Sequence, residues 1–334
     1  MRTLWLIQGI QGYQEKLFKT LTSKRTLFNR TLLWLAFMLA VWVFAGCSGS
    51  KKDPFYAFQN GTIHVSVDES FRPVIEEQIK VFETSFPGAK IIAEYKTEAN
   101  CLKDFFYDTA NSMAIITRGL GAEEENYWQD SLGHLPSWNV VAYDAITLIV
   151  NKNNPDTLFT IEKLRLLLSG KGDRKQKLIF DGLNSTSTVR FISDSILKGR
   201  SFDTSVVKAV KNSQEVVNYI ANNENAVGFV GISWVGNPED SEQMRMLGKV
   251  KIAYVACDVC SDTPYVKPLQ SSILTRRYPL VRGLYFVHKD GTEGLARGYS
   301  NFLRSERGQL IFKRAYLGTV MDFEVRNVKL TKKL

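Results

Sequence analysis

The chain has 334 residues, 44% of them hydrophobic, so it is long and apolar enough to bury a substantial core. This composition excludes a disordered tail and allows one large domain or two medium domains. The formal net charge is +9, but more than half of the surplus precedes Cys47, and the remaining basic residues are interleaved with acidic ones. Such a balance does not favour nucleic acid as a partner, and we expect none.

The N-terminal region has the layout of an export signal. Basic residues precede an uncharged apolar run at residues 31–46, and a polar stretch follows Cys47. The run is short for a membrane span, although a retained transmembrane anchor is the alternative. The small residues before the cysteine are similar to a bacterial lipobox, whose cysteine is lipidated after cleavage. The sequence therefore predicts a signal peptide at residues 1–46, a membrane lipid anchor at Cys47, a linker at residues 47–59, and a cell-envelope location, either periplasmic or on the outer surface.

The other cysteines do not identify a chemistry. Cys257 and Cys260 form a Cys-x-x-Cys pair, and Cys101 stands alone. No second pair and no cluster of histidines accompanies them, so the spacing does not indicate a metal or redox site, and we expect no cofactor. A local disulfide and two buried thiols are both compatible with the pair.

From residue 52 onward, segments that alternate like strands are followed by segments whose apolar residues have helical spacing, which predicts an α/β fold. Strands are predicted at residues 61–67, 91–95, 113–117, 178–180 and 226–231. The apolar stretch at residues 140–151 is too long for a surface strand, so we expect it to cross from one domain to the next. Residues 250–255 are expected to carry the chain back.

Polar loops follow the first three predicted strands. In parallel α/β sheets, ligands bind outside the carboxyl ends of the strands, so these loops belong to the candidate site. Their candidate binding residues are Ser70, Thr97, Thr117 and Arg118.

The segment at residues 180–191 has the pattern of a strand end, a turn rich in hydroxyl groups and a helix start. At a helix start, unpaired backbone N–H groups and the positive end of the helix dipole favour an anion, which hydroxyl groups and a nearby arginine can also hold. Ordinary helix capping is the alternative, because Ser, Thr and Asn are the preferred capping residues. The candidate binding residues of this segment are Ser185, Thr186, Ser187, Thr188 and Arg190.

Six short motifs occur in order along the chain. They are Gly-Thr-Ile at residues 61–63, Ile-Thr-Arg-Gly-Leu at 116–120, Tyr-Asp-Ala with Ile-Val-Asn within 143–151, Ala-Val-Gly-Phe-Val-Gly at 226–231, Tyr-Pro-Leu-Val-Arg-Gly-Leu-Tyr at 278–285, and Ser-Glu-Arg-Gly-Gln at 305–309. Through these motifs, residues 60–320 resemble the phosphate-binding protein of the Pst-type ABC transporter. The resemblance implies a periplasmic-binding-protein type II fold, with two α/β lobes joined by two crossing strands that close on an oxyanion. The implied lobes are residues 60–143 with 256–334, and residues 144–255.

The resemblance also implies a function without catalysis: a monomer that captures phosphate or a related oxyanion and presents it to an ABC permease. In the family, a Ser or Thr follows the first strand, and Ser70 matches it. An arginine followed by Ser-Gly-Thr begins the helix of the second lobe. Here residues 186–188 stand for Ser-Gly-Thr, and Asp181 or Gly182 occupies the place of the arginine.

The positive charge is therefore expected from Arg190 or Arg118, because a guanidinium suits an oxyanion. A phosphate-selective site also needs an acceptor, since monohydrogen phosphate carries a proton that sulfate lacks. Glu69, Glu98 and Asp181 lie in or near the predicted site loops and could accept this proton. Without it, the same carboxylates would repel a dianion.

Two other classes of function stay open. One is a sensor or a surface interaction protein that keeps the fold with an altered or lost anion site. The other is a serine hydrolase, which the sequence disfavours because it has no Gly-x-Ser-x-Gly elbow and no histidine near a predicted site loop.

Overall fold

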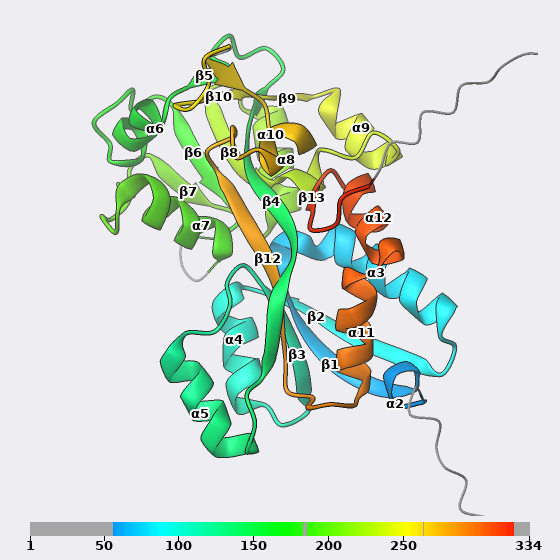
Figure 1. Ribbon diagram of the computed structural model, residues 1–334. Helices are drawn as coiled ribbons and strands as arrows, with labels where there is room; N and C mark the ends of the chain where they lie inside the picture. Colours follow the sequence, from blue (N-terminus) through cyan, green and yellow to red (C-terminus); the bar gives the residue numbers. More distant parts are fainter. Residues whose placement is uncertain (1–55, 183–185, 263, 324–334) are drawn as a thin grey trace, which may run out of the picture. The chain divides into compact units, whose positions relative to one another are not determined.

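The computed structural model describes residues 56–182, 186–262 and 264–323 (Figure 1). The predicted signal peptide, the anchor at Cys47 and the candidate residue Ser185 lie outside the described residues. Within the described ranges, no helix combines the length and the apolar character that crossing a membrane requires.

Two antiparallel strands, β4 (Ser137–Asn151) and β12 (Val281–His288), lie in the middle of the large sheet that the described residues form (Figure 1). The main path of this sheet is β2-β1-β3-β12-β4-β8-β6-β7. β4 pairs with β12 over residues 137–145 and with β8 over residues 146–150, so it runs from one lobe into the other. This pairing confirms the crossing predicted at residues 140–151. The second half of β4 is buried throughout, as expected for a strand covered on both faces.

The chain does not return from the second lobe to the first at the segment that the sequence predicted. Residues 250–255 supply β9 (Val250–Ile252), which pairs with the Asn151 end of β4, and begin β10 (Tyr254–Ala256) in a separate small sheet. The return lies just before β12, where Ile146 N donates to Leu280 O at 2.9 Å. The prediction for residues 250–255 is therefore wrong, because pairing within the second lobe takes up that apolar segment.

The first lobe is built on the parallel strands β1 (Gly61–Asp68), β2 (Ala89–Lys96) and β3 (Asn111–Ile116), which confirm the strands predicted there. Its helices are α3 (Arg72–Ser85), α4 (Glu98–Tyr107) and α5 (Ala122–Leu132), joined by α2 (Tyr56–Gln59), α11 (Leu295–Arg304), α12 (Glu306–Arg314) and the short strand β13 (Gly318–Thr319). Phe82 of α3 packs against Tyr299 and Phe302 of α11, so both ends of the described chain share one core.

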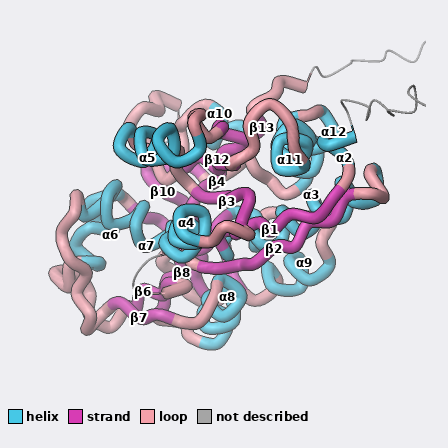
Figure 2. Tube along the Cα trace, turned by 90° about the horizontal axis from the view of Figure 1, so that it is seen from below, coloured by secondary structure: helices cyan, strands magenta, loops and turns pink. Residues whose placement is uncertain are grey.

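The second lobe is built on the parallel strands β6 (Lys177–Phe180), β7 (Val207–Ala209) and β8 (Ala226–Gly231). Its helices are α6 (Ile161–Leu168), α7 (Ser187–Ile192), α8 (Ser213–Asn222) and α9 (Ser241–Leu247). The view from below also shows helices covering the strands of both lobes (Figure 2). In the first lobe, the loops that follow β1 and β3 come to the level at which β4 crosses (Figure 1).

A small sheet of β5 (Leu158–Phe159), β10 and β11 (Tyr265–Val266) lies near α10 (Gln270–Leu274) at the upper end of Figure 1. Cys257 and Cys260 form a disulfide just after β10, so the disulfide is the alternative that the structure adopts. Cys101 is a free, buried thiol.

Capping side chains begin most of the longer helices. The residue before the helix accepts a backbone hydrogen bond through its side-chain oxygen and satisfies an N–H group that has no partner within the helix. These capping residues are Thr97, Thr160, Thr186, Asn212, Asp240 and Ser305.

Candidate functional site

Ser70 stands at the carboxyl end of β1, where the sequence predicted a binding loop. A turn of 3-10 helix at Glu69–Phe71 follows the strand, and the Asp68 carboxylate accepts the Ser70 backbone N–H at 2.9 Å. The Ser70 hydroxyl is buried, and its Oγ lies 3.4 Å from Ser187 Oγ and 3.5 Å from Thr188 Oγ1. The structure thus brings together hydroxyl groups from the two lobes.

The turn before α7 both caps a helix and supplies hydroxyl groups to this cluster. Thr186 is the capping residue, since its Oγ1 accepts from Val189 N at 3.3 Å. Ser187 and Thr188, in the first turn, are fully buried and face Ser70. Thr186 therefore fits the interpretation of this segment as a helix cap. Ser187 and Thr188 lie where the anion-binding interpretation requires hydroxyl groups.

Ser213, at the first position of α8, is a further member of this group of buried hydroxyl residues, and sequence reasoning missed it. Its buried Oγ lies 3.1 Å from Asp181 Oδ2 and 3.1 Å from Glu69 Oε2. In the sequence it has the appearance of an ordinary residue at a helix start, because Asn212 precedes it as the cap. We call Ser70, Ser187, Thr188 and Ser213 the hydroxyl cluster.

Arg282, the second residue of β12, is the cation of this cluster, and sequence reasoning missed it as well. Its side chain is 1% exposed, and it donates from Nε to Asp144 Oδ2 at 2.9 Å and from Nη1 to Ser187 Oγ at 2.8 Å. Its guanidinium carbon lies 5.0 Å from the centre of the Phe71 ring. Among the described residues, Nη2 has no hydrogen-bond partner although it is buried. The available signal was a lone arginine within an apolar strand, which has to be paired if that strand is buried.

Gly231, at the end of β8, allows the backbone to approach this pair closely. A Cβ atom there would lie 3.2 Å from Asp144 Oδ2 and 3.5 Å from Ser70 O. The first distance is shorter than an ordinary van der Waals contact, so a larger residue would press on the Arg282–Asp144 pair.

The two arginines predicted from the sequence have carboxylate partners elsewhere. Arg190 donates from Nε to Glu98 Oε2 at 2.6 Å and from Nη2 to Thr117 Oγ1 at 2.8 Å. Thr117 in turn donates from N and Oγ1 to Glu98. These three residues form a second contact between the lobes, which we call the Glu98 contact.

Arg118 and Thr97 serve local structure. Arg118 makes two hydrogen bonds of 2.7 Å to the Glu124 carboxylate at the start of α5. Thr97 caps α4. In the described ranges, neither residue is bonded to the hydroxyl cluster.

Carboxylates surround the guanidinium of Arg282. Burial raises the pKa of Asp68 to about 6, although the charge of Arg282 works in the opposite direction. Burial also raises the pKa of Asp144 and of Asp181 against the same charge. The pKa of Glu69 is raised to about 7 by burial and by the neighbouring charge of Asp181.

Glu98 behaves differently from this group. Burial works to raise its pKa, but hydrogen bonds from Arg190 and Thr117 outweigh it and hold the pKa below the ordinary value. The Glu98 contact is therefore a satisfied ion pair, while the cluster around Arg282 contains buried acceptors with incomplete partners. Within the described part of the chain, Asp68 Oδ2 and Asp181 Oδ1 have no hydrogen-bond partner.

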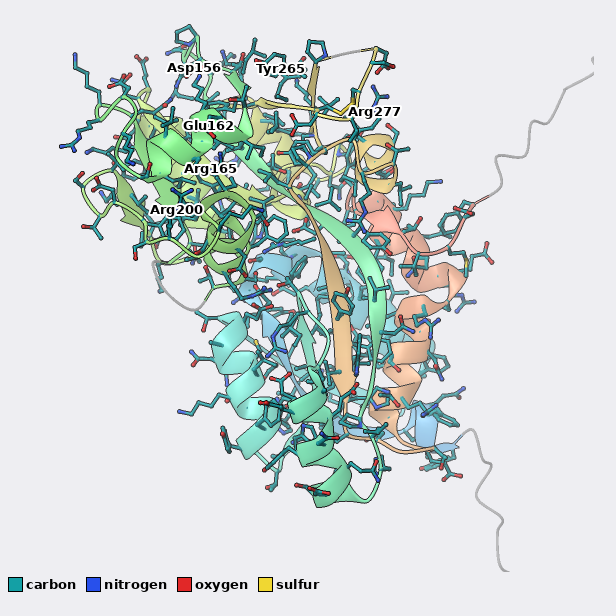
Figure 3. The ribbon with its side chains drawn as sticks, turned by 60° about the vertical axis from the view of Figure 1, so that its left-hand side comes forward. Asp156, Glu162, Arg165, Arg200, Tyr265 and Arg277 are labelled. Carbon is teal, nitrogen blue, oxygen red and sulfur yellow. A yellow bond between two sulfur atoms is a disulfide. The ribbon has the colours of Figure 1, made fainter. Side chains whose placement is uncertain are left out.

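Ion pairs on the outside of the molecule lack these features. Glu162 and Arg165 pair with each other on α6, on the outer surface of the second lobe (Figure 3). Such exposed pairs contribute little to stability and do not organise a site.

A family model for the PBP superfamily domain matches residues 57–307. The chain belongs to the PBP superfamily. This PBP protein has the two-lobed α/β fold of that family, which confirms the fold and the family-level resemblance predicted from the sequence.

Solved structures show the same fold. A Clostridium perfringens protein described as a phosphate ABC transporter substrate-binding protein with bound phosphate is 20% identical, with a TM-score of 0.62 over 78% of this chain and 100% of its own. An ABC-type phosphate transport receptor from Vibrio cholerae is 17% identical, with a TM-score of 0.56 over 78% and 100%. A possible phosphate binding protein from Planctomyces limnophilus is 18% identical, with a TM-score of 0.53 over 78% and 94%. No curated protein sequence matches this chain.

These neighbours are described as binding proteins or transport receptors. The His134 ring contacts the backbone carbonyls of Leu132 and Lys289. His288 ends β12, six residues beyond Arg282. Among the described residues, no hydrogen bond joins a histidine to the hydroxyl cluster.

Proposed function

We propose that this PBP protein is an exported, lipid-anchored solute-binding protein of the cell envelope. It captures phosphate or a related oxyanion between its lobes, acts as a monomer, and delivers the anion to an ABC permease. The observation that carries the proposal is Arg282: a buried guanidinium whose Nη2 has no described partner, beside hydroxyl groups from both lobes.

The hydroxyl cluster and Arg282 have complementary roles in this proposal. Hydroxyl groups donate to the anion's oxygens, and the guanidinium supplies the positive charge in an environment from which water is excluded, where such bonds are strong. The resemblance to phosphate-binding proteins supports the choice of anion. Of the predicted residues, Ser70, Ser187 and Thr188 are the proposed ligands, with Ser213 and Arg282 added.

The carboxylates explain why a protonated oxyanion suits this site better than sulfate. Asp68 Oδ2 is a buried acceptor without a described partner. Monohydrogen phosphate can donate its proton to it, whereas sulfate has no proton to donate at neutral pH. Sulfate would therefore meet uncompensated repulsion.

Access to the cluster requires the lobes to separate. Ser70 belongs to the first lobe and Ser187 to the second, and both are buried between them. Hinge bending where β4 and β12 join the lobes would expose them, and closure would bury the anion. The Glu98 contact lies across the same division, so we assign Arg190 and Thr117 to lobe closure.

Thermal unfolding tests the proposal. Purified protein, freed of bound anion, is compared with and without phosphate and sulfate at matched ionic strength. At about 100 times the dissociation constant, a ligand adds about 2.7 kcal/mol to the free energy of unfolding and raises the midpoint by several degrees. A rise with phosphate supports the proposal, and no rise with either anion contradicts it.

The second candidate is a sensor or interaction protein that keeps the fold and has altered anion chemistry. The excess of buried carboxylates over the single Arg282 guanidinium favours it, because an anion is repelled unless some of them are protonated. It predicts no response to phosphate in the same experiment.

A further inference from the structure

Three hydroxyl groups converge on one carboxylate oxygen of this chain. Asp181 Oδ2 lies 3.1 Å from Ser213 Oγ, 3.4 Å from Ser70 Oγ and 3.5 Å from Thr188 Oγ1. Ser70 comes from the first lobe, and the other two residues come from separate helices of the second. Asp181 is itself 94% buried, since its exposed fraction is 6%.

These surroundings are those of a bound oxyanion. A carboxylate oxygen has the charge and the acceptor geometry of an oxygen of phosphate or sulfate, and it is held by the same hydroxyl donors. Burial raises the pKa of Asp181, and the charge of Arg282 works against that rise, as it would also attract a bound anion. The other oxygen, Oδ1, is buried and has no hydrogen-bond partner among the described residues.

We propose that Asp181 is a built-in anion: its carboxylate takes the place of an oxyanion oxygen and holds the lobes together when no ligand is bound. An external oxyanion has to displace it from the hydroxyl groups, so Asp181 weakens the binding of every anion and sets its affinity. This inference rests on the proposed function of the same site.

The charges around the site support this competition. Arg282 is paired with Asp144, and its charge also acts on Asp68 and Asp181. An incoming anion adds negative charge to a group in which carboxylates outnumber the cation. Among these carboxylates, Asp181 accepts from the same hydroxyl groups that would hold the anion. Removing its charge should therefore favour anion binding most.

The position of Asp181 in the fold also suits a side chain that swings away. It directly follows the last residue of β6, Phe180, and precedes Gly182, whose φ of 152° is a backbone conformation that favours glycine. The aspartate therefore stands at a turn rather than within a strand. Rotation about its side-chain bonds would release Ser70 without breaking the sheet.

Isothermal titration of purified protein with phosphate and sulfate, at pH 7.5 and matched ionic strength, tests the inference. The variants are Asp181→Asn, which keeps the shape and removes the charge, and Asp181→Ala. Asp156→Asn is the matched control, because it removes a carboxylate from the same lobe at the outer surface, where Asp156 pairs with Lys163 (Figure 3). Small-angle scattering of each anion-free protein reports lobe closure independently of binding.

We expect both Asp181 variants to bind phosphate and sulfate at least tenfold more tightly than the wild type, and to be more open than it when anion-free. The Asp156→Asn protein should match the wild type in both measurements. Asp181 variants that bind phosphate with equal or lower affinity would overturn the inference and leave the proposed function standing. If the wild type and all variants bind neither anion, the proposed function fails, and the inference fails with it.

Discussion

Arg282 and Asp144 lie directly opposite each other in the pairing of β12 with β4, and Arg282 Nε is 2.9 Å from Asp144 Oδ2. Both side chains are at most 1% exposed, at the point where β4 passes from the first lobe to the second. The pair therefore places a fixed positive charge at the junction of the lobes. A further donor of Arg282, Nη1, reaches Ser187 of the hydroxyl cluster.

Replacing Arg282 by Met should destabilise the protein strongly. The change leaves Asp144 as a buried carboxylate without its counter-ion, a loss that typically costs about 3 to 5 kcal/mol. Denaturant unfolding measures it. Arg118→Met is the matched control, because its pair with Glu124 is about one-third exposed and should contribute about 1 kcal/mol or less. Equal losses in the two variants would contradict the assignment of Arg282 as the buried cation.

Removing single hydroxyl groups should separate binding residues from capping residues. Ser187→Ala and Ser70→Ala each remove a proposed donor to the anion and should weaken phosphate binding about 10-fold or more, since a hydrogen bond to a charged group is worth about 1.5 to 3 kcal/mol. Thr97→Ala removes the α4 cap, so it should cost about 1 kcal/mol of stability with no loss of affinity. Calorimetric titration and thermal unfolding give both quantities; unchanged affinity in the serine variants would refute the site.

The Glu98 contact should influence lobe closure more than anion affinity. Arg190→Gln and Glu98→Gln each break the ion pair between α7 and α4, and the double variant should show a coupling energy of about 1 to 2 kcal/mol. Small-angle scattering should show a more open anion-free protein in each case. Additive effects on stability would mean that the two residues act separately.

Stability should fall as the pH rises from about 5 to 8. The pKa of Glu69 is raised from about 4.5 to about 7, so the folded protein binds more protons than the unfolded chain between these values. The resulting stabilisation is complete below pH 4.5 and is lost as the pH rises through 7. Asp68, with its pKa near 6, acts in the same direction.

Glu69→Gln tests this dependence, because it removes one of the carboxyl groups whose pKa is raised. Thermal midpoints of the variant, in buffers without phosphate, should change less with pH than those of the wild type. Identical pH profiles would show that Glu69 does not titrate in this range.

Local patterns in the sequence were sufficient for the main architecture. The alternation of residues 61–67 and the apolar run at residues 140–151 predicted β1 and the crossing strand, because the periods of strands and helices are properties of a short segment. The hydroxyl-rich turn before α7 was recognisable for the same reason. Ser70, Ser187 and Thr188 could accordingly be selected as candidates before their contacts were known.

Only the tertiary structure decided which charges belong to the site. Arg190 and Arg118 are close to the predicted loops in sequence, but Glu98 and Glu124 pair with them, and Arg282 comes to the hydroxyl cluster from a strand nearly 100 residues later. The return of the chain at β12, rather than at residues 250–255, was missed in the same way. Ion pairing and strand pairing between distant segments depend on proximity in space and on the exclusion of water, and neither leaves a periodic pattern in the sequence.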